Sequence, residues 1–465
     1  MSQRPDIDSI VQRVLSKLGD ALNEPGGLPG TAGCDVDGYV AASAKAQEIW
    51  HRDFGLERRS QIVEEIRADL RPHIESLAKM AVEETGMGNL RDKIIKKSVT
   101  IEKTPGPESI KPNAITGDKG LVLEEHAPYG VIASIIPCTN PVATVIHNAI
   151  CMISGGNSVI FAPHPKAVNV SLRTVGIIAH TLRACGAPDN LVSALTDPSM
   201  DNLGKLMKHP KVRLISATGG PGVVHAALTS GKPAVGAGPG NPPVVVDETA
   251  NLDIAGKGVV NGASFDNNLL CVCEKELIVV NCVADDLKKR MLEHGAYELR
   301  DRKEIELLER AILNGDNTPN KNFVGKDATY ILEKIGLKVP LSVRLIIVET
   351  TEDHPFAQEE LLMPVLPLIR VADFEEALAM AKRLEHGFHH SAVIYSTNID
   401  HMSKMAREIE TTMFVKNAPA YCSLGADSDC PVTLTIATAT GQGATSPESF
   451  CRMRRCVLSG AFRII

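Results

Sequence analysis

The stretch Val131-Ile132-Ala133-Ser134-Ile135-Ile136-Pro137-Cys138-Thr139-Asn140-Pro141 decides the fold. It begins with a nearly continuous apolar run and ends in a polar turn between two prolines. A short run of this kind is typical of a strand buried on both faces of a parallel sheet. Similar strands are expected at Val159–Ala162, Leu191–Leu195 and Val212–Ala217, separated by helices at Ala143–Ile153, Val168–Arg183 and Leu203–Met207. The alternation predicts an α/β fold with helices on both faces of a parallel sheet.

The second half of the chain repeats this mixture of strands and helices. Strands are expected at Val244–Val246, Leu277–Val280, Leu345–Val348 and Val393–Tyr395, with helices at Ala284–His294, Ile305–Leu313 and Phe374–Leu384. A second α/β lobe is the natural prediction. Ligands in such sheets bind beyond the carboxyl ends of the strands, so the turns that follow strands are candidate sites.

Two segments lie outside this alternation. Residues 111–127 resemble an extended hairpin around Gly117-Asp118-Lys119-Gly120. In residues 6–22, apolar side chains recur at helical spacing opposite a polar face, which predicts an amphipathic helix. Pro25-Gly26-Gly27-Leu28-Pro29-Gly30 then breaks this helix and forms a flexible tether. A short helix is marginal alone in water, so it needs a partner, which is either another protein or its own domain.

Composition restricts the class of protein. The 465 residues are 44% hydrophobic and 23% charged, which is ordinary for a globular chain of two or three domains. A net charge of −7 without a basic stripe makes nucleic acid or an anionic membrane an unexpected partner. The eleven cysteines include no Cys-x-x-Cys pair, so we expect no metal site and reduced thiols in a cytosol-like compartment.

Cys271 is the candidate nucleophile. It follows the polar, Asn-rich stretch Ser264-Phe265-Asp266-Asn267-Asn268 and precedes the apolar run Leu277–Val280. A cysteine where a loop meets a strand can face a cleft while a sheet holds its backbone, which suits a reactive thiol. Strand alternation would place Cys273 on the same side. We expect Cys273 to be a packed neighbour, as we expect most of the other cysteines to be small buried hydrophobes.

Three further strings are candidate ligand contacts. Thr218-Gly219-Gly220-Pro221-Gly222 follows an expected strand and opens a helix, where free N–H groups favour a phosphate; a tight turn without a ligand is the alternative. Thr139 and Asn140 end the first strand and could donate hydrogen bonds into a cleft. Glu360 could bind a ribose hydroxyl pair, or it could lie at a solvated helix end.

In chain order these strings are similar to those of the aldehyde dehydrogenase superfamily, over essentially residues 36–465. That family has a Pro-flanked Asn/Thr turn, a Gly-rich NAD turn, a second Gly string, a cysteine nucleophile about 35 residues later, and a glutamate that contacts ribose. The resemblance assigns these features to Pro137–Pro141, Thr218–Gly222, Gly236–Pro242, Cys271 and Glu360.

One departure from this pattern indicates the branch of the family. Hydrolytic members begin the second Gly string with a glutamate, the base that activates water, and here that position is Gly236. The chain therefore resembles the CoA-acylating branch, which also carries strings like Glu385–His390 and Arg452–Leu458. Within it, the chain is most similar to the propionaldehyde and acetaldehyde dehydrogenases of bacterial microcompartments. The chain differs from these relatives at two positions. Leu270 stands where they often have proline, and Cys273 adds a second thiol.

The resemblance implies oxidation of a short aldehyde, propionaldehyde or acetaldehyde, with NAD and coenzyme A to acyl-CoA and NADH. Cys271 would carry the acyl group as a thioester, and Thr139 or Asn140 would stabilise the oxyanion. Expected cofactor contacts are Pro163, His164, Thr218, Gly219, Gly220, Gly222, Gly238 and Glu360. No acid in Ala162–Lys166 repels a 2′-phosphate, so NADP is also allowed. The rival functions are a hydrolytic or semialdehyde dehydrogenase, an acyl-phosphate reductase, or a catalytically degenerate cargo or scaffold protein.

The resemblance also implies an organisation. We expect a targeting helix at 1–22, a linker at 23–35, an NAD/CoA-binding domain at 36–110 and 128–235, a catalytic domain at 236–436, and an oligomerisation arm at 111–127 and 437–465. The arm and the apolar tail Ala461–Ile465 suggest strands shared between subunits, hence a homodimer or homotetramer. Residues 6–22 would bind a shell protein or other cargo, so the expected location is a microcompartment in the bacterial cytoplasm.

Overall fold

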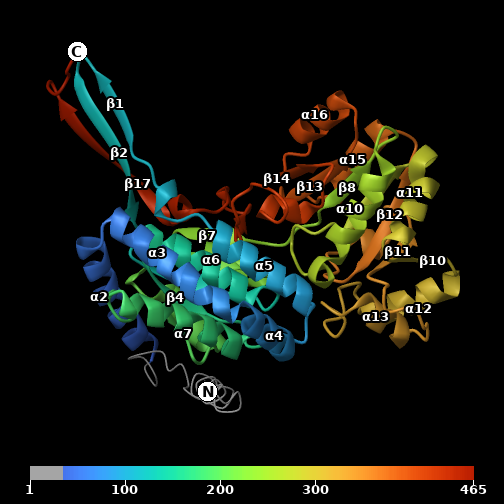
Figure 1. The fold of residues 1–465 in the computed structure, drawn as a ribbon, viewed down its shortest axis with the longest axis horizontal. Coiled ribbons are helices and arrows are strands. Elements are labelled where there is room, and N and C mark those ends of the chain that lie inside the picture. Colours follow the sequence, from blue (N-terminus) through green and yellow to red (C-terminus); the bar gives the residue numbers. More distant parts are fainter. Residues whose placement is uncertain (1–34) are drawn as a thin grey trace, which may run out of the picture.

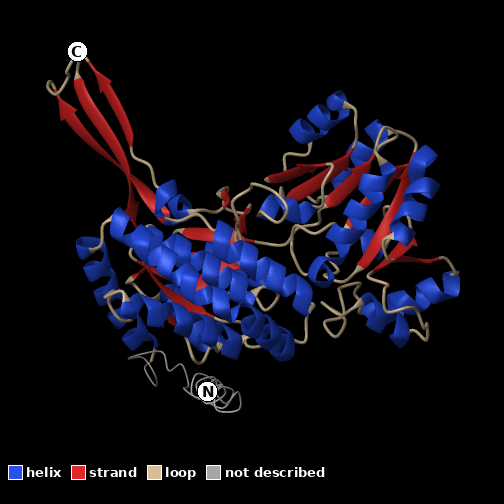
Figure 2. Cartoon of the chain, viewed as in Figure 1, coloured by secondary structure: helices blue, strands red, loops and turns tan. Residues whose placement is uncertain are grey.

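Two parallel sheets and one projecting antiparallel sheet organise residues 35–465, the part of the chain that the computed structural model describes. Each parallel sheet lies inside its own lobe, with helices on both faces (Figures 1 and 2). This confirms the predicted α/β class and the two doubly wound lobes. The amphipathic helix expected in residues 6–22 lies outside the described residues.

The first lobe is built on the five-stranded sheet of the described chain, in the order β5-β4-β3-β6-β7 with all neighbours parallel. Its central strand, β3, contains the apolar run that begins at Val131, and all five of its residues are buried. The strands are β3 (Val131–Ile135), β4 (Ser158–Ala162), β5 (Val192–Ala194), β6 (Val212–Thr218) and β7 (Ala234–Ala237).

Helices cover both faces of this sheet because its strands are apolar on both sides. One core joins the sheet to the entirely buried α6 and to α3 and α7; the other joins it to α2 and α8. The helices are α2 (Val36–Asp53), α3 (Leu56–Leu70), α4 (Ile74–Thr85), α5 (Leu90–Lys103), α6 (Pro141–Ser154), α7 (Val168–Ala184), α8 (Met200–Lys208) and α9 (Pro221–Leu228), with short 3-10 turns η1 (Arg71–His73) and η2 (Pro107–Ser109).

The second lobe is built on the seven-stranded parallel sheet of residues 35–465, in the order β10-β11-β12-β9-β8-β13-β14. The strands are β8 (Pro243–Val246), β9 (Glu276–Val280), β10 (Ala296–Leu299), β11 (Leu345–Glu349), β12 (Val365–Val371), β13 (Ser391–Tyr395) and β14 (Met413–Lys416). The surrounding elements are α10 (Leu252–Ser264), η3 (Phe265–Asn268), α11 (Asn281–Glu293), α12 (Arg302–Ile312), α13 (Ala328–Lys334), α14 (Pro355–Gln358), α15 (Phe374–Leu384), α16 (Ile399–Glu408) and η4 (Ala420–Leu424).

The third sheet forms an arm that projects away from both lobes and carries the C-terminus at its tip (Figure 1). It contains β1 (Asn113–Gly117), β2 (Gly120–Pro128) and β17 (Cys451–Ser459), paired antiparallel in the order β1-β2-β17. The hairpin predicted in 111–127 is therefore confirmed. The tail Ala461–Ile465 follows β17 without regular structure in the single chain, so the strand that it would share with another subunit stays a prediction.

Residues between the last strand of the second lobe and the arm return to the first lobe. They include β15 (Ile436–Ala437), β16 (Gly443–Ala444) and η5 (Pro447–Phe450), and Ala437 and Phe450 are part of the first lobe's core. Within the described part of the chain, every helix is too short or too polar to cross a membrane.

Candidate active site

The carboxyl edge of the first sheet gathers most of the residues expected at the site. Because all five strands are parallel, the turns that follow them open on one side. Thr139 and Asn140 follow β3, Pro163 and His164 follow β4, the Gly-rich turn follows β6, and Gly238 follows β7. From β3 the chain adds β4 and β5 on one side, and it then crosses over to add β6 and β7 on the other side. A crevice opens beside the strand at which the order reverses in this way.

The Gly-rich turn fits the phosphates of a dinucleotide. Gly220 is the N-cap of α9, without a side-chain cap, and Pro221 occupies the first turn. A Cβ atom added at Gly220, Gly222 or Gly238 would meet nothing within 4 Å. The backbone at the start of α9 is therefore open, and its free N–H groups favour an anion. Residues of this type fit NAD or NADP.

The candidate nucleophile lies at the amino edge of the second sheet. Cys271 precedes β9, and two other segments reach the same edge: Gly240 precedes β8 and Glu360 precedes β12. The backbone N–H of Gly240 bonds Glu360, and the charge of Glu360 acts on Cys271. The structure thus brings Glu360 beside Cys271, whereas sequence reasoning gave it only a ribose contact.

Three consecutive left-handed residues shape the turn before Cys271. Asp266, Asn267 and Asn268 have φ values of 47°, 56° and 65°. Non-glycine residues rarely adopt this conformation, and it persists only where the surroundings fix it. Each side chain is held separately: Asn267 Nδ2 donates to the carbonyl of Gly325 and to Asp327, and Asn268 Nδ2 donates to the carbonyls of Ala263 and Glu274.

Asp266 connects this turn to the first lobe. It is fully buried, and its Oδ2 accepts hydrogen bonds from Lys93 and Lys96 of α5, which lies on the side of the first lobe that faces the second (Figure 1). Lys96 Nζ also donates to Oδ1 of Asn140. One lysine therefore ties the Asn140 side chain to the turn that carries Cys271. Sequence reasoning missed these lysines, because a charged helix usually indicates a solvated face.

The electrostatic surroundings of Cys271 oppose a free thiolate. Burial and the nearby Glu360 raise its pKa to about 12, while Lys275 and the backbone N–H groups of Cys271 and Val272 act in the opposite direction. The Cys271 side chain is partly exposed, whereas Cys273 is fully buried and burial raises the pKa of its thiol still further.

The expectation of strand alternation between the two cysteines is wrong. Residues 271–273 form turns, and β9 begins only at Glu276. The amide of Cys273 donates to the carbonyl of Leu270, so the segment is folded tightly instead of extended. The two thiols differ in exposure for this reason, and Cys273 packs in the core of the second lobe.

Gly236 lies inside β7, where its N–H donates to Oγ1 of Thr440 at 3.0 Å. A Cβ atom added there would contact Val224 of α9 at 3.2 Å and Thr440 at 3.6 Å. A side chain at this position therefore requires Val224 to move by a few tenths of an ångström. The nearest acid that the structure places at the nucleophile is Glu360, and burial raises its pKa, which favours the neutral form.

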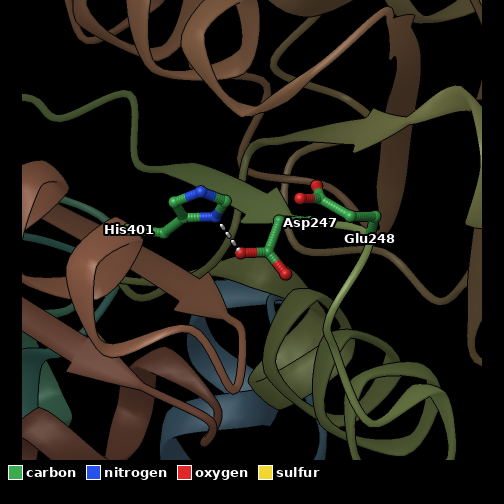
Figure 3. A group of neighbouring side chains, drawn as sticks. All are labelled: Asp247, Glu248 and His401. Carbon is green, nitrogen blue, oxygen red and sulfur yellow. Dashed lines mark hydrogen bonds and ion pairs between the residues drawn. The ribbon is translucent and has the colours of Figure 1, made fainter.

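One cluster outside this site has residue types that also bind metals: Asp247, Glu248 and His401 (Figure 3). Nδ1 of His401 lies 2.8 Å from Oδ2 of the buried Asp247, and Oδ1 of Asp247 accepts two hydrogen bonds from Thr249. His401 also stacks on Phe374. Both carboxylate oxygens of Asp247 are therefore used by the protein, and the contacts fasten α16 to the end of β8.

The first lobe thus has a sheet edge suited to a nucleotide, and the second lobe has a cysteine after a strained turn; Lys96 links the two. The model of the aldehyde dehydrogenase family matches residues 26–301 and 339–428. The chain belongs to the aldehyde dehydrogenase family, which confirms the resemblance read from its motifs.

Several relatives match nearly the whole length of the chain. The chain is 45% identical over 470 residues to the acetaldehyde dehydrogenase (acetylating) EutE of Salmonella typhimurium. The match covers 99% of each protein. A solved Rhodopseudomonas palustris propionaldehyde dehydrogenase, with bound CoA and an acylated cysteine, superposes with a TM-score of 0.91 at 46% identity, over 93% of this chain and 98% of that one. The propionaldehyde dehydrogenase of the Clostridium phytofermentans fucose utilisation microcompartment gives 0.90 at 43% identity, over 93% and 99%.

Proposed function

We propose that the protein is a CoA-acylating aldehyde dehydrogenase that converts a short aldehyde, propionaldehyde first and acetaldehyde second, with CoA and NAD into acyl-CoA and NADH. The observation that carries this proposal is the partly exposed Cys271 beside a glycine string with no acid at Gly236. The relatives support it, because they are acetylating and propionaldehyde enzymes and do not favour the hydrolytic alternative.

In the first half-reaction, Sγ of Cys271 attacks the aldehyde carbon and a hemithioacetal oxyanion forms. Nδ2 of Asn140 and the backbone N–H of Cys271 are the proposed donors to this oxygen. Lys96 holds Oδ1 of the same amide, so the amide nitrogen is turned away from the lysine. Thr218–Gly222 and Glu360 would hold NAD, which would supply the hydride acceptor. Loss of hydride leaves the acyl group on Cys271 as a thioester.

In the second half-reaction, the sulfur of CoA attacks the thioester carbonyl and Cys271 leaves as thiolate. Exchange between two thioesters is close to neutral in energy, so a strong base is unnecessary. The absence of an acid at Gly236 then protects the intermediate, because water near the thioester is poorly activated.

A direct assay tests this function. NADH formation from propionaldehyde should depend on CoA, and acyl-CoA should accumulate in equal amount. The same assay with acetaldehyde, and with NADP in place of NAD, ranks the substrates. NADH formation at full rate without CoA, together with free carboxylate, would instead establish a hydrolytic enzyme; no reduction with any aldehyde would favour a degenerate scaffold protein.

NADP is a second nucleotide that the site can accept. The turn after β4 offers Pro163, His164 and Lys166 and contains no acid, so nothing in it repels a 2′-phosphate. Burial and the charges of Lys166 and Lys321 lower the pKa of His164. These two lysines supply positive charge near His164, which favours a phosphate.

We further propose a location inside a bacterial microcompartment, with residues 6–22 as the docking helix for a shell protein or other cargo. The amphipathic pattern and the Pro/Gly tether support this, as does a relative from such a compartment. Deleting residues 1–22 should preserve the rate with propionaldehyde and CoA and abolish co-sedimentation with shells. A large loss of rate would mean that this segment packs on the enzyme itself.

The arm supports a homodimer or homotetramer. Ile115, Val122 and Val457 lie opposite one another across its three strands and form an apolar stripe on one face. Ile115 and Val457 are 55% and 63% exposed, on a sheet that projects from the body. An exposed apolar stripe of this kind is expected to be buried in an interface, and we propose that a second copy of the chain buries it.

A further inference from the structure

Lys275 is a buried cation with an unusual set of partners. Its side chain is nearly inaccessible to solvent, and its Nζ donates to the carbonyl of Asn268 at 3.0 Å, to Oδ1 of Asn268 and to the carbonyl of Leu270 at 3.4 Å. An ammonium group has three hydrogens, and here three oxygen atoms accept them. All three belong to the turn that leads into Cys271. The ammonium group is therefore satisfied by two backbone carbonyls just before Cys271 and by one side-chain amide oxygen.

The backbone of Lys275 is fixed as well. Its N–H donates to the carbonyl of Pro242 at 3.0 Å, immediately before β8. Lys275 thus clamps the left-handed residue Asn268 and the carbonyl next to Cys271 onto the central strands of the second sheet. Because the conformation of Asn268 is strained, the clamp must be supplied by the surroundings, and Lys275 supplies it.

We propose that Lys275 is the positioning residue of the nucleophile: its buried ammonium group fixes the turn before Cys271 and provides the positive charge that favours the Cys271 thiolate. This inference rests on the proposed function only in taking Cys271 as the reacting thiol.

Burial shifts the acids around Lys275 toward their neutral forms. Burial raises the pKa of Glu274 to about 7 and raises the pKa of Glu276 well above its ordinary value; Glu360 is shifted the same way. Both carboxyl oxygens of Glu276 lack a hydrogen-bond partner among the described residues, which fits a neutral, protonated group. The charge of Glu360 raises the pKa of Cys271 and the charge of Lys275 lowers it, so Lys275 offsets part of the effect of burial and of Glu360.

Other charged and titratable groups surround Lys275 and Cys271 and come from several elements. Glu360 precedes β12 and acts on Cys271. His390 precedes β13, and burial and the charge of Lys275 lower the pKa of this histidine. From the segment of Lys275 itself come Cys273, Glu274 and Glu276, and Lys96 of α5 faces Cys273. Among these, Lys275 is the group whose charge lowers the pKa of Cys271.

The test is the rate at which iodoacetamide alkylates Cys271 at pH 8 in the full chain without nucleotide. Below the pKa of a thiol this rate follows the thiolate fraction. Lys275→Gln keeps a donor for the turn but removes the charge, and we expect about a tenfold slower reaction. Lys275→Arg keeps the charge and should stay within about threefold of the wild type. Lys97→Gln, which removes a different buried lysine, is the matched control and should leave the rate unchanged.

The direction of the change separates the proposal from a purely structural role. If Lys275 only held the fold together, its loss would open the turn and bring Cys271 toward the ordinary pKa of an exposed thiol, so alkylation would accelerate. Acceleration or no change in Lys275→Gln would overturn the proposal. The site of alkylation is read by mass spectrometry after digestion with a protease that does not cut at lysine, and fragment ions distinguish Cys271 from Cys273. The readout needs no aldehyde or CoA, so it is independent of whether the proposed reaction occurs.

Discussion

At the scale of the residue, the chemistry depends on which thiol an aldehyde can reach. Cys271 is partly exposed at the amino edge of the second sheet, and Cys273, two residues later, is sealed in the core. The difference comes from the tight turn between them. An alternating strand would have given both thiols the same exposure.

Replacing Cys271 with alanine should abolish NADH formation, by at least about 10³-fold, because the proposed thioester forms on its sulfur. Cys273→Ala is the matched control and should retain most of the activity. Initial rates with propionaldehyde and CoA measure both variants. The assignment fails if Cys273→Ala loses the activity and Cys271→Ala keeps it.

Replacing Gly236 with glutamate should raise the share of carboxylate among the products, because a base returns at the position that activates water in hydrolytic relatives. The new side chain needs a shift of a few tenths of an ångström from Val224. Gly236→Ala controls for this crowding without a base. Chromatography of acid and acyl-CoA gives the ratio, and an unchanged ratio would contradict the role of the missing acid.

At the scale of the element, the turn from α10 through η3 to β9 is held by buried polar side chains. Glu274 shows how closely it is packed: its Oε1 accepts from the amide of Ala420 at 2.8 Å, and a Cβ atom on Gly262 would lie 2.0 Å from the same carboxylate. The second oxygen has no partner among the described residues. Burial therefore raises the pKa of Glu274 from 4.5 to about 7.

This pKa predicts a pH dependence of stability. The folded chain binds the Glu274 proton more tightly than the unfolded chain, so the associated stability is present below about pH 4.5 and is lost as pH rises to about 7. Glu274→Gln removes the ionisation, so relative to wild type it should gain up to about 3 kcal/mol between pH 5 and pH 8. Thermal midpoints at the two pH values measure the gain, with the surface change Glu57→Gln as control. If the difference in thermal midpoint between variant and wild type were the same at both pH values, the raised pKa of Glu274 would be refuted.

At the scale of the whole molecule, the two lobes together form the candidate site and the arm lies apart from it. The lobes meet where α5 holds Asp266 and Asn140 through Lys96. The proposed oxyanion donor and the turn that carries the proposed nucleophile, which belong to different lobes, are therefore fixed relative to each other. The arm projects away from this contact, and Ile115 and Val457 of its apolar stripe are exposed.

Charging the stripe should dissociate the proposed oligomer. The double change Ile115→Asp and Val457→Asp places carboxylates on two exposed apolar positions of the arm, and burying them against a second copy would be costly. Light scattering after size exclusion should then report the mass of one chain. Lys119→Asp, at the tip of the hairpin, is the control and should keep the mass of the wild type. An unaltered mass in the double variant would exclude this face as an interface.

The sequence by itself determined the strands and helices that have a strong pattern. β3, β4, β9 and β13 are runs composed mostly of apolar residues, and α15 was predicted with its observed bounds, Phe374–Leu384. Order and spacing of the Gly strings and Cys271 also sufficed to indicate the family and its branch. Strands such as β10 and β14 were missed, because four residues with mixed polarity carry too little local signal and form only by pairing with their neighbours.

Only the tertiary structure decided how the site is held. Lys96 and Asp266 are 170 residues apart, yet they form one buried contact, and Glu360 arrives beside Cys271 from another segment. Charged residues of this kind look solvated in a sequence, since burial and partners are set by packing over long distances. A motif records which groups are present. The pKa of a thiol, the exposure that separates Cys271 from Cys273, and the lysine that orients an amide depend on the positions of those groups in space.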